Sequence, residues 1–189
     1  MRRILPGVLL FLLLVQFCPP VLAANVYLCE GFGSYQTNTY ELEGYDTVGD
    51  VQVVEEKSEK CLLLHHDTYS QISKKFENPL EGSFIFSFDL KGGKHRVCMD
   101  VGLSSATEKY LLLKVDENAL KLSDGKQVGT LTGERFTKVA VGYNALSGRI
   151  TVWIDGKIKA GNWAMSFSSS SYSGIYMRHA AQCGDVYID

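Results

Sequence analysis

Apolar and polar side chains alternate along most of this chain. From residue 83 the sequence reads SFIFSFDL, which places its three phenylalanines and Leu90 on one side of an extended segment. This period of two is typical of a β-strand with one buried face. The segments KVAVGYN (138–144) and RITVWID (149–155) alternate in the same way, and Asp155-Gly156 is a strong signal for a two-residue hairpin turn. The pattern predicts antiparallel strands joined by tight turns.

Segments of this kind recur along the chain, separated by Gly, Asn, Asp and Ser. They predict roughly ten to thirteen short strands, and no window of about twelve residues carries the apolar stripe of a helix. The expected fold is all-β: a two-sheet antiparallel β-sandwich with one core between the sheets. No internal repeat or linker divides the chain, so a single domain is expected.

The first residues follow a different pattern. Arg2 and Arg3 precede an apolar run at residues 8–15, and small residues stand before Ala24. This is the layout of a secretory signal peptide. We therefore expect residues 1–23 to be a signal peptide and residues 24–189 to be the secreted β-sandwich domain. No later apolar stretch is long enough to predict a membrane span.

Removal of that leader leaves 166 residues with 17 basic and 21 acidic side chains, so the charge gives no reason to expect a nucleic-acid partner. Four cysteines remain: Cys29, Cys61, Cys98 and Cys183. An even number in an exported chain favours disulfides over metal ligation, and four cysteines allow three pairings. We expect Cys29–Cys183, which would join the two chain ends at a sheet edge, and Cys61–Cys98.

The segment V-A-V-G-Y, followed by a turn and then by G-R-I-T-V-W-I-D-G-K, resembles the paired strands near the end of concanavalin A-like lectin/glucanase and laminin-G-like domains. The opening C-E-G-F, the strand F-I-F-S-F-D-L and the closing D-V-Y-I-D follow the same order of elements. The resemblance covers nearly all of residues 25–189 and implies a concanavalin-like jelly roll. This fold carries lectins, glycosidases, polysaccharide lyases and protein-binding modules, so it does not select among them.

Catalytic motifs of those enzymes are absent. The E-x-D-x-E strand of the β-glucan hydrolases is missing, and Glu41 and Glu43 lie in a polar stretch where solvated charge is expected. A lyase would need a tyrosine or histidine with an arginine or glutamine, and its R-x-E-x-R and Q-I-H motifs are missing. Tyr176 and Arg178 share one face of their strand, whereas His179 falls on the other.

Metal binding is not expected either. The neighbours His65 and His66 would point to opposite faces of a strand, so at most one could enter a site. The resemblance implies that calcium is possible, with Asp46, Asp50 and Asp185 as candidate ligands, but no calcium-loop motif is present. We therefore expect no cofactor.

Aromatic residues are the best candidates for binding, because sugars stack on aromatic rings. Trp153 lies opposite the branched apolar residues of its strand, so either it faces outward or it fills the core and they face out. In the first case Trp153, Tyr176 and Arg178 could share the concave surface of a sheet, with Trp163 and Tyr172 on a loop at its rim. The expected function is a secreted, non-catalytic module that binds a polysaccharide or an extracellular glycoprotein. The alternatives are a polysaccharide lyase or glycosidase, and a structural or adhesion module of a larger surface assembly.

Overall fold

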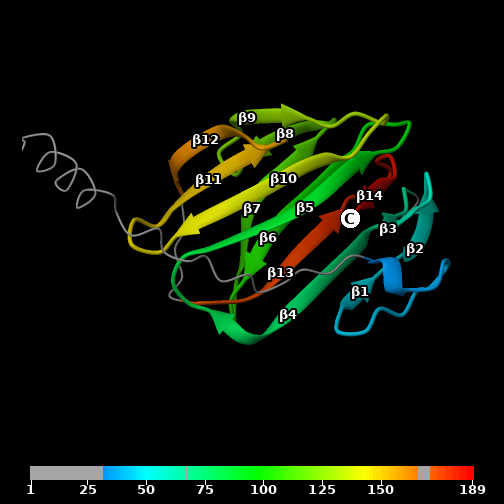
Figure 1. The fold of residues 1–189 in the computed structure, drawn as a ribbon, viewed down its shortest axis with the longest axis horizontal. Helices are drawn as coiled ribbons and strands as arrows, with labels where there is room; N and C mark the ends of the chain where they lie inside the picture. Colours follow the sequence, from blue (N-terminus) through cyan, green and yellow to red (C-terminus); the bar gives the residue numbers. More distant parts are fainter. Residues whose placement is uncertain (1–31, 67, 166–170) are drawn as a thin grey trace, which may run out of the picture.

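The strands pair into two antiparallel sheets in the computed structural model, which describes residues 32–66, 68–165 and 171–189 (Figure 1). The expected signal peptide and Cys29 lie outside the described residues. Sheet A has the order β1 (Asp46–Val48), β4 (Ser70–Leu80), β13 (Tyr172–His179), β6 (Cys98–Ser104), β7 (Lys109–Asp116), β8 (Ala119–Leu122) and β9 (Gln127–Thr130). Sheet B has the order β12 (Lys157–Ala164), β11 (Arg149–Ile154), β10 (Thr137–Asn144), β5 (Phe84–Gly92), β14 (Val186–Ile188), β3 (Glu59–Leu64) and β2 (Val51–Glu56). A short 3-10 helix, η1 (Phe32–Ser34), precedes the strands.

The hairpin expected around residues 138–156 is confirmed. Strands β10 and β11 pair with Val141 opposite Val152, and β11 continues through Asp155-Gly156 into β12. Both turn residues have positive φ angles, 49° and 74°, as a type I′ turn requires. Glycine adopts this conformation without steric cost, which explains why Asp-Gly marks the turn.

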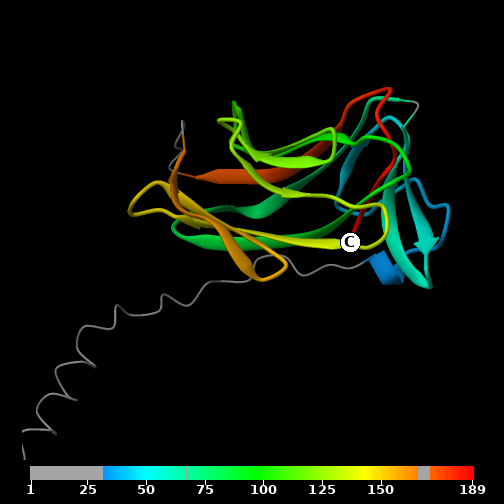
Figure 2. The ribbon, with the colours of Figure 1, turned by 90° about the horizontal axis from the view of Figure 1, so that it is seen from above.

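The two sheets stack face to face (Figure 2). Their inward side chains form one core. The alternation assigns these side chains correctly: the branched residues of β11 and the valines of β10 are buried, and Trp153 faces outward. The predicted all-β sandwich is therefore confirmed. None of the described residues forms a helix long and apolar enough to cross a membrane.

Tyr172 belongs to the core, so its expected place on a loop rim is wrong. Its side chain is 1% exposed, and its ring meets the rings of Phe84, Tyr110 and Tyr143 edge-on at centroid distances of 5.8, 5.8 and 5.5 Å. The pairing of β13 with β4 shifts register between Tyr172 and Gly174. This irregularity turns Tyr172 inward, although simple alternation would place it on the same face as Tyr176.

The expected Cys61–Cys98 pairing is wrong. Cys61 alternates with core leucines of β3 and Cys98 with core residues of β6, so the two thiols lie on outer faces of opposite sheets. The core, about 10 Å thick in such sandwiches, separates them. Strand β14 lies inside sheet B between β5 and β3, rather than at the sheet edge expected for the joined chain ends. The three described cysteines are free thiols in the structure.

Cys183 instead lies beside Cys98. Backbone N–H groups of Ala180 and Gly184 donate to the carbonyl oxygens of Cys98 and Arg96, at 3.1 and 2.5 Å, and so fasten both ends of the turn that carries Cys183. Burial, together with the neighbouring Cys98 thiol, raises the pKa of Cys183 to about 11.

Candidate functional site

Polar side chains gather on the outer face of sheet A, across strands β4, β13, β6 and β7. Met177 and His179 of β13 point into the sandwich, so Tyr176 and Arg178 point out, as the alternation predicted. His179 is fully buried, its Nε2 lies 2.9 Å from the Gly184 carbonyl oxygen, and burial lowers its pKa. We call the outward group the polar face; it comprises Tyr69, Gln71, Asp100, Lys109, Lys114, Tyr176 and Arg178.

Arg178 is held by Asp100, its direct neighbour on β6. The guanidinium donates through Nε to Asp100 Oδ2 at 3.2 Å, and its Nη2 contacts the same oxygen. This hydrogen bond raises the pKa of Arg178, which stays charged at any physiological pH. The Asp100 side chain is only 19% exposed, whereas Arg178 is 43% exposed. Asp100 therefore fixes the direction of a cation that still reaches solvent.

Tyr176 lies flat across β6 because its partner there is Gly102. A Cβ atom at Gly102 would come within 2.5 Å of Tyr176 Oη and closer still to the Tyr110 carbonyl oxygen. The Lys109 ammonium lies 5.1 Å from the Tyr176 ring centroid, within cation–π range. Only 4% of Tyr176 is exposed, and burial raises the pKa of its phenol. The phenol is therefore protonated at neutral pH.

Gln71 joins the two sides of the polar face. It pairs with Arg178 across β4 and β13, and its Oε1 accepts hydrogen bonds from Lys109 Nζ at 3.1 Å and from the Tyr69 hydroxyl at 3.2 Å. Tyr69 is 45% exposed, so its ring remains available to a ligand. The sequence interpretation did not name Tyr69, Asp100 or Lys109 as site residues. The strand pairing that brings them together leaves no local sequence signal.

An open hollow of about 350 Å³ lies at one end of this face. Tyr69, Asp100, Lys114 and Arg178 line it, together with Asp116. Asp116 accepts a hydrogen bond from Lys121 Nζ at 2.8 Å, which lowers its pKa. In the hollow and beside it, the outer face of sheet A carries two carboxylates, and each is paired with a cation. The same region carries four cations: Lys109, Lys114, Lys121 and Arg178.

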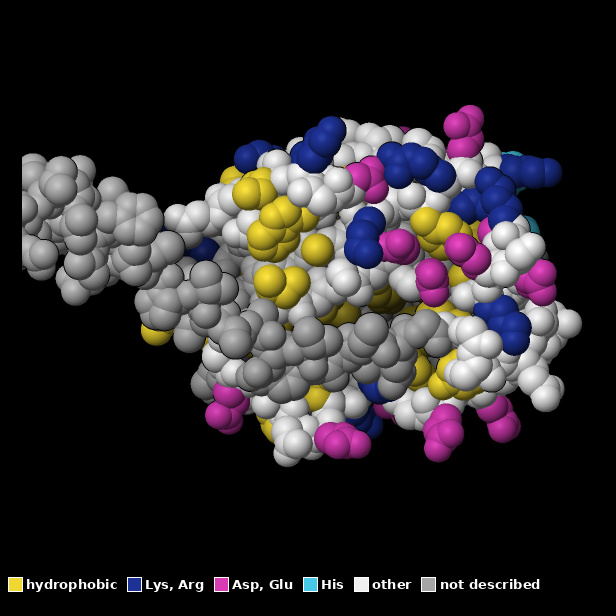
Figure 3. Space-filling model, viewed as in Figure 1, with side chains coloured by type: hydrophobic (Ala, Val, Ile, Leu, Met, Phe, Trp, Pro, Cys, Tyr) yellow, Lys and Arg dark blue, Asp and Glu magenta, His cyan; other side chains and the backbone are white. Residues whose placement is uncertain are grey.

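The two tryptophans lie elsewhere. Trp153 is on the outer face of sheet B, where its ring lies over Gly142 and near Ile85. Figure 3 shows hydrophobic side chains gathered near β11 and β12 on this face. Trp163 is on β12 rather than on a loop, and it packs against the core with Lys126 Nζ 4.7 Å above its ring. The expected grouping of Trp153 with Tyr176 and Arg178 is wrong, because β11 and β13 belong to different sheets.

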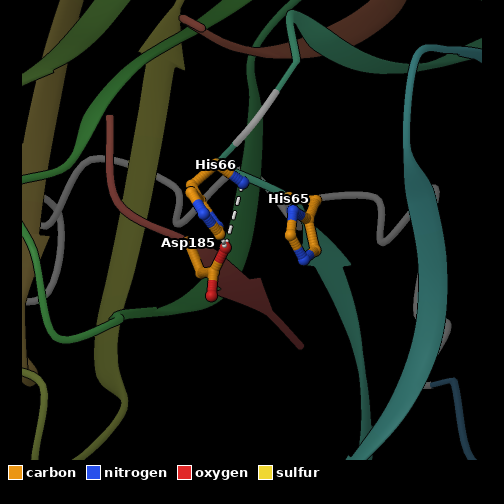
Figure 4. Close-up of side chains that lie close together, drawn as sticks. All are labelled: His65, His66 and Asp185. Carbon is orange, nitrogen blue, oxygen red and sulfur yellow. Dashed lines mark hydrogen bonds and ion pairs between the residues drawn. The ribbon is translucent and has the colours of Figure 1, made fainter. Parts of the chain in front are cut away.

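A second cluster, His65, His66 and Asp185, lies where β3 and β14 meet the adjoining loops (Figure 4). Strand β3 ends at Leu64, so the two histidines lie outside the strand and their side chains need not point in alternating directions. Their rings stack with centroids 4.5 Å apart, and the expectation that they point to opposite faces is wrong. The Nδ1 and the backbone N–H of His66 each lie 2.9 Å from Asp185 Oδ1.

The remaining candidate carboxylates for calcium binding or catalysis do not lie together in one site. Asp46 pairs with Lys75 at 3.2 Å on the exposed edge of sheet A. Glu41 and Glu43 are exposed on either side of buried Leu42. Among the described residues, Asp185 is grouped with the two histidines and not with Asp46 or Asp50.

Two stacked seven-stranded antiparallel sheets define a concanavalin-like jelly-roll fold. The structure is similar to a sialidase (TM-score 0.67, 13% identity), covering 84% of this chain but only 17% of the sialidase. It is also similar to the catalytic domain of a glycoside hydrolase family 131 protein from Coprinopsis cinerea (TM-score 0.59, 13% identity, 87% and 92% covered). A third similar structure is the carbohydrate recognition domain of Emp47p (TM-score 0.52, 15% identity, 84% and 89% covered). No protein-family model and no curated protein sequence matches the chain.

Proposed function

We propose that the protein is a secreted, non-catalytic module that binds an acidic glycan on the polar face of sheet A. The glycan would be a polysaccharide or the sugar chain of an extracellular glycoprotein. The observation that carries the proposal is the convergence of Arg178 and Lys114 with the exposed ring of Tyr69 around one open hollow. Lys109 adds a further cation on the same face, where it donates to Gln71. Carbohydrate-related proteins among the structures of similar fold are in keeping with it.

Each part of the polar face has a role in such binding. The Tyr69 ring can stack on the apolar side of a sugar ring. Arg178 can form charge-assisted hydrogen bonds with a uronate carboxylate, since Asp100 already orients the guanidinium. Lys114 lies opposite Asp100 and adds a second cation within the same hollow. The excess of cations on this face favours an acidic over a neutral sugar chain.

The acidic side chains and the tyrosine of this region are poorly suited to acid–base catalysis, in agreement with a binding role. Asp100 and Asp116 each form an ion pair with a cation, and the bond from Lys121 lowers the pKa of Asp116, whereas a general acid needs a raised pKa. The Tyr176 phenol has a raised pKa and is a poor base at neutral pH. His179, its neighbour in sequence, faces the core.

A polysaccharide lyase is the alternative, because Tyr176, Arg178 and Gln71 share one face as a lyase acting on uronates would require. Unsaturated products absorb in the ultraviolet. A steady rise in ultraviolet absorbance on alginate or polygalacturonate, lost in Tyr176→Phe, would replace the binding proposal by this one.

Arg178→Ala is expected to weaken binding of oligogalacturonate by about 10- to 100-fold, because a hydrogen bond to a charged group contributes about 1.5–3 kcal/mol. Tyr69→Ala removes the stacking ring and should weaken binding by about 2- to 10-fold. Both variants are measured by isothermal titration calorimetry on residues 24–189. Affinity should also fall as salt is raised. Matched controls are Arg149→Ala on sheet B and Tyr40→Ala, whose side chains are also exposed.

Neutral galacto-oligosaccharides serve as the ligand control. Equal affinity for acidic and neutral chains would reject the acidic specificity. Unchanged binding in Arg178→Ala and Tyr69→Ala, with loss in Arg149→Ala, would move the site to the other sheet and contradict the proposal.

A further inference from the structure

All four histidines of the chain lie toward one end of the sandwich, although they come from distant segments. His65 and His66 follow β3, His95 lies between β5 and β6, and His179 ends β13. The segment Gly184-Asp185 connects them: His179 bonds the Gly184 carbonyl oxygen, His66 bonds Asp185, and His66 and His95 line one hollow with Gly184.

Three of these side-chain groups converge closely. One nitrogen of His65, one nitrogen of His66 and one carboxylate oxygen of Asp185 all lie within 4.8 Å of one another (Figure 4). The backbone N–H of His66 donates to Asp185 Oδ1 at 2.9 Å and orients the carboxylate. The His66 and Asp185 side chains are 45% and 28% exposed, so an ion in solvent can reach them.

The donor set indicates the kind of ion. Two imidazole nitrogens and one carboxylate oxygen suit Zn²⁺ and related divalent transition metals, whereas Ca²⁺ and Mg²⁺ prefer oxygen ligands alone. Bonds of about 2.0–2.2 Å to a tetrahedral Zn²⁺ place donors about 3.3–3.6 Å apart. The three donors lie within 4.8 Å of one another, so rotation of these partly exposed side chains has to shorten their separations by at most about 1.5 Å.

Nearby cations are largely neutralised. Lys91 contacts Glu56, and Arg96 donates to Glu117 Oε1 at 2.6 Å. Lys94 lines the same hollows as His66, but its long side chain can extend into solvent. The local charge therefore permits a divalent ion.

We propose that His65, His66 and Asp185 form a site for a divalent transition-metal ion, Zn²⁺ in the first instance, with water in the remaining coordination positions. The three proposed metal ligands do not belong to the polar face, so this proposal does not depend on glycan binding.

The test is titration of metal-free protein, residues 24–189, with Zn²⁺ by calorimetry and with Co²⁺ by visible absorption. One ion should bind per chain, and the Co²⁺ spectrum should show the intense bands of a four-coordinate site. His65→Ala, His66→Ala and Asp185→Asn should each weaken Zn²⁺ binding by about 10- to 100-fold or more. Asp185→Asn retains an oxygen that can accept the His66 backbone hydrogen bond, so it tests the charge with little change in the fold.

Two control variants test whether Zn²⁺ binds to other cysteine or histidine side chains near this site. The double variant Cys98→Ser/Cys183→Ser and the single variant His95→Ala should both bind Zn²⁺ as the unmodified chain does. The absence of saturable binding in the unmodified chain would overturn the proposal. So would undiminished binding in the three site variants, or a loss of binding confined to the cysteine or His95 variants.

Discussion

Replacing Tyr172 by alanine is expected to lower the free energy of unfolding by about 3–5 kcal/mol, as for other large aromatic side chains removed from a core. Tyr172 is fully buried, and it contacts three rings edge-on between the two sheets. Its removal leaves a cavity and breaks these contacts, each of which adds about 0.5–1.5 kcal/mol beyond its buried area. Urea denaturation followed by tryptophan fluorescence measures the loss.

Two variants make this prediction specific. Tyr172→Phe keeps the ring and its edge-on contacts and removes only the hydroxyl, so it should cost no more than about 1 kcal/mol. Tyr40→Ala removes a tyrosine that is 55% exposed and should change stability by no more than about 0.5 kcal/mol. If Tyr172→Ala were as mild as Tyr40→Ala, Tyr172 would not occupy the core.

Oxidised protein, in which Cys98 and Cys183 are linked, is expected to lose about 4 kcal/mol of stability when both cysteines are replaced by serine. We expect these neighbouring thiols to form a disulfide by exchange with a disulfide donor, which takes up the two electrons and two protons released. A crosslink that closes a loop of this length is expected to stabilise by roughly 4–4.7 kcal/mol through the unfolded state. Urea denaturation of both oxidised proteins gives the difference.

Peptide mapping without reductant identifies the bond itself. A crosslinked peptide pair containing Cys98 and Cys183 is expected. A bridge from Cys98 to Cys61 would contradict the structure, because their thiols lie on outer faces of opposite sheets. Two free thiols at Cys98 and Cys183 in protein recovered from an oxidising compartment would contradict the prediction.

Local alternation was sufficient to predict much of the fold. It separated Trp153 from the core-facing residues of β11, placed Tyr176 and Arg178 together, and turned His179 away from them. The turn at Asp155-Gly156 followed from backbone chemistry alone. These features depend on residues a few positions apart, which a single sequence displays directly.

Other features depend on irregularities or on distant strands. The register shift after Tyr172 reverses its side chain, and the end of β3 at Leu64 frees His65 and His66 to stack. Alternation does not predict where a strand is interrupted. The assignment of Trp153 and Tyr176 to different sheets requires the strand order, which is set by contacts between segments far apart in the sequence.

The polar face arises from the same kind of distant pairing. Gln71, Asp100 and Lys109 come from three strands, and Gly102 lets the Tyr176 ring lie between them. No two of these residues form a recognisable motif. Their chemistry becomes visible only after β4, β13, β6 and β7 are placed side by side.

Nuclear magnetic resonance tests the proposed binding surface most directly, because it identifies the protein residues that the sugar contacts. In a titration of isotope-labelled protein with oligogalacturonate, the largest shift changes should fall on outward residues of β4, β13, β6 and β7, centred on Tyr69 and Arg178. Shift changes centred on Trp153 of sheet B, or no changes at saturating concentrations of acidic oligosaccharides, would contradict a glycan site on sheet A.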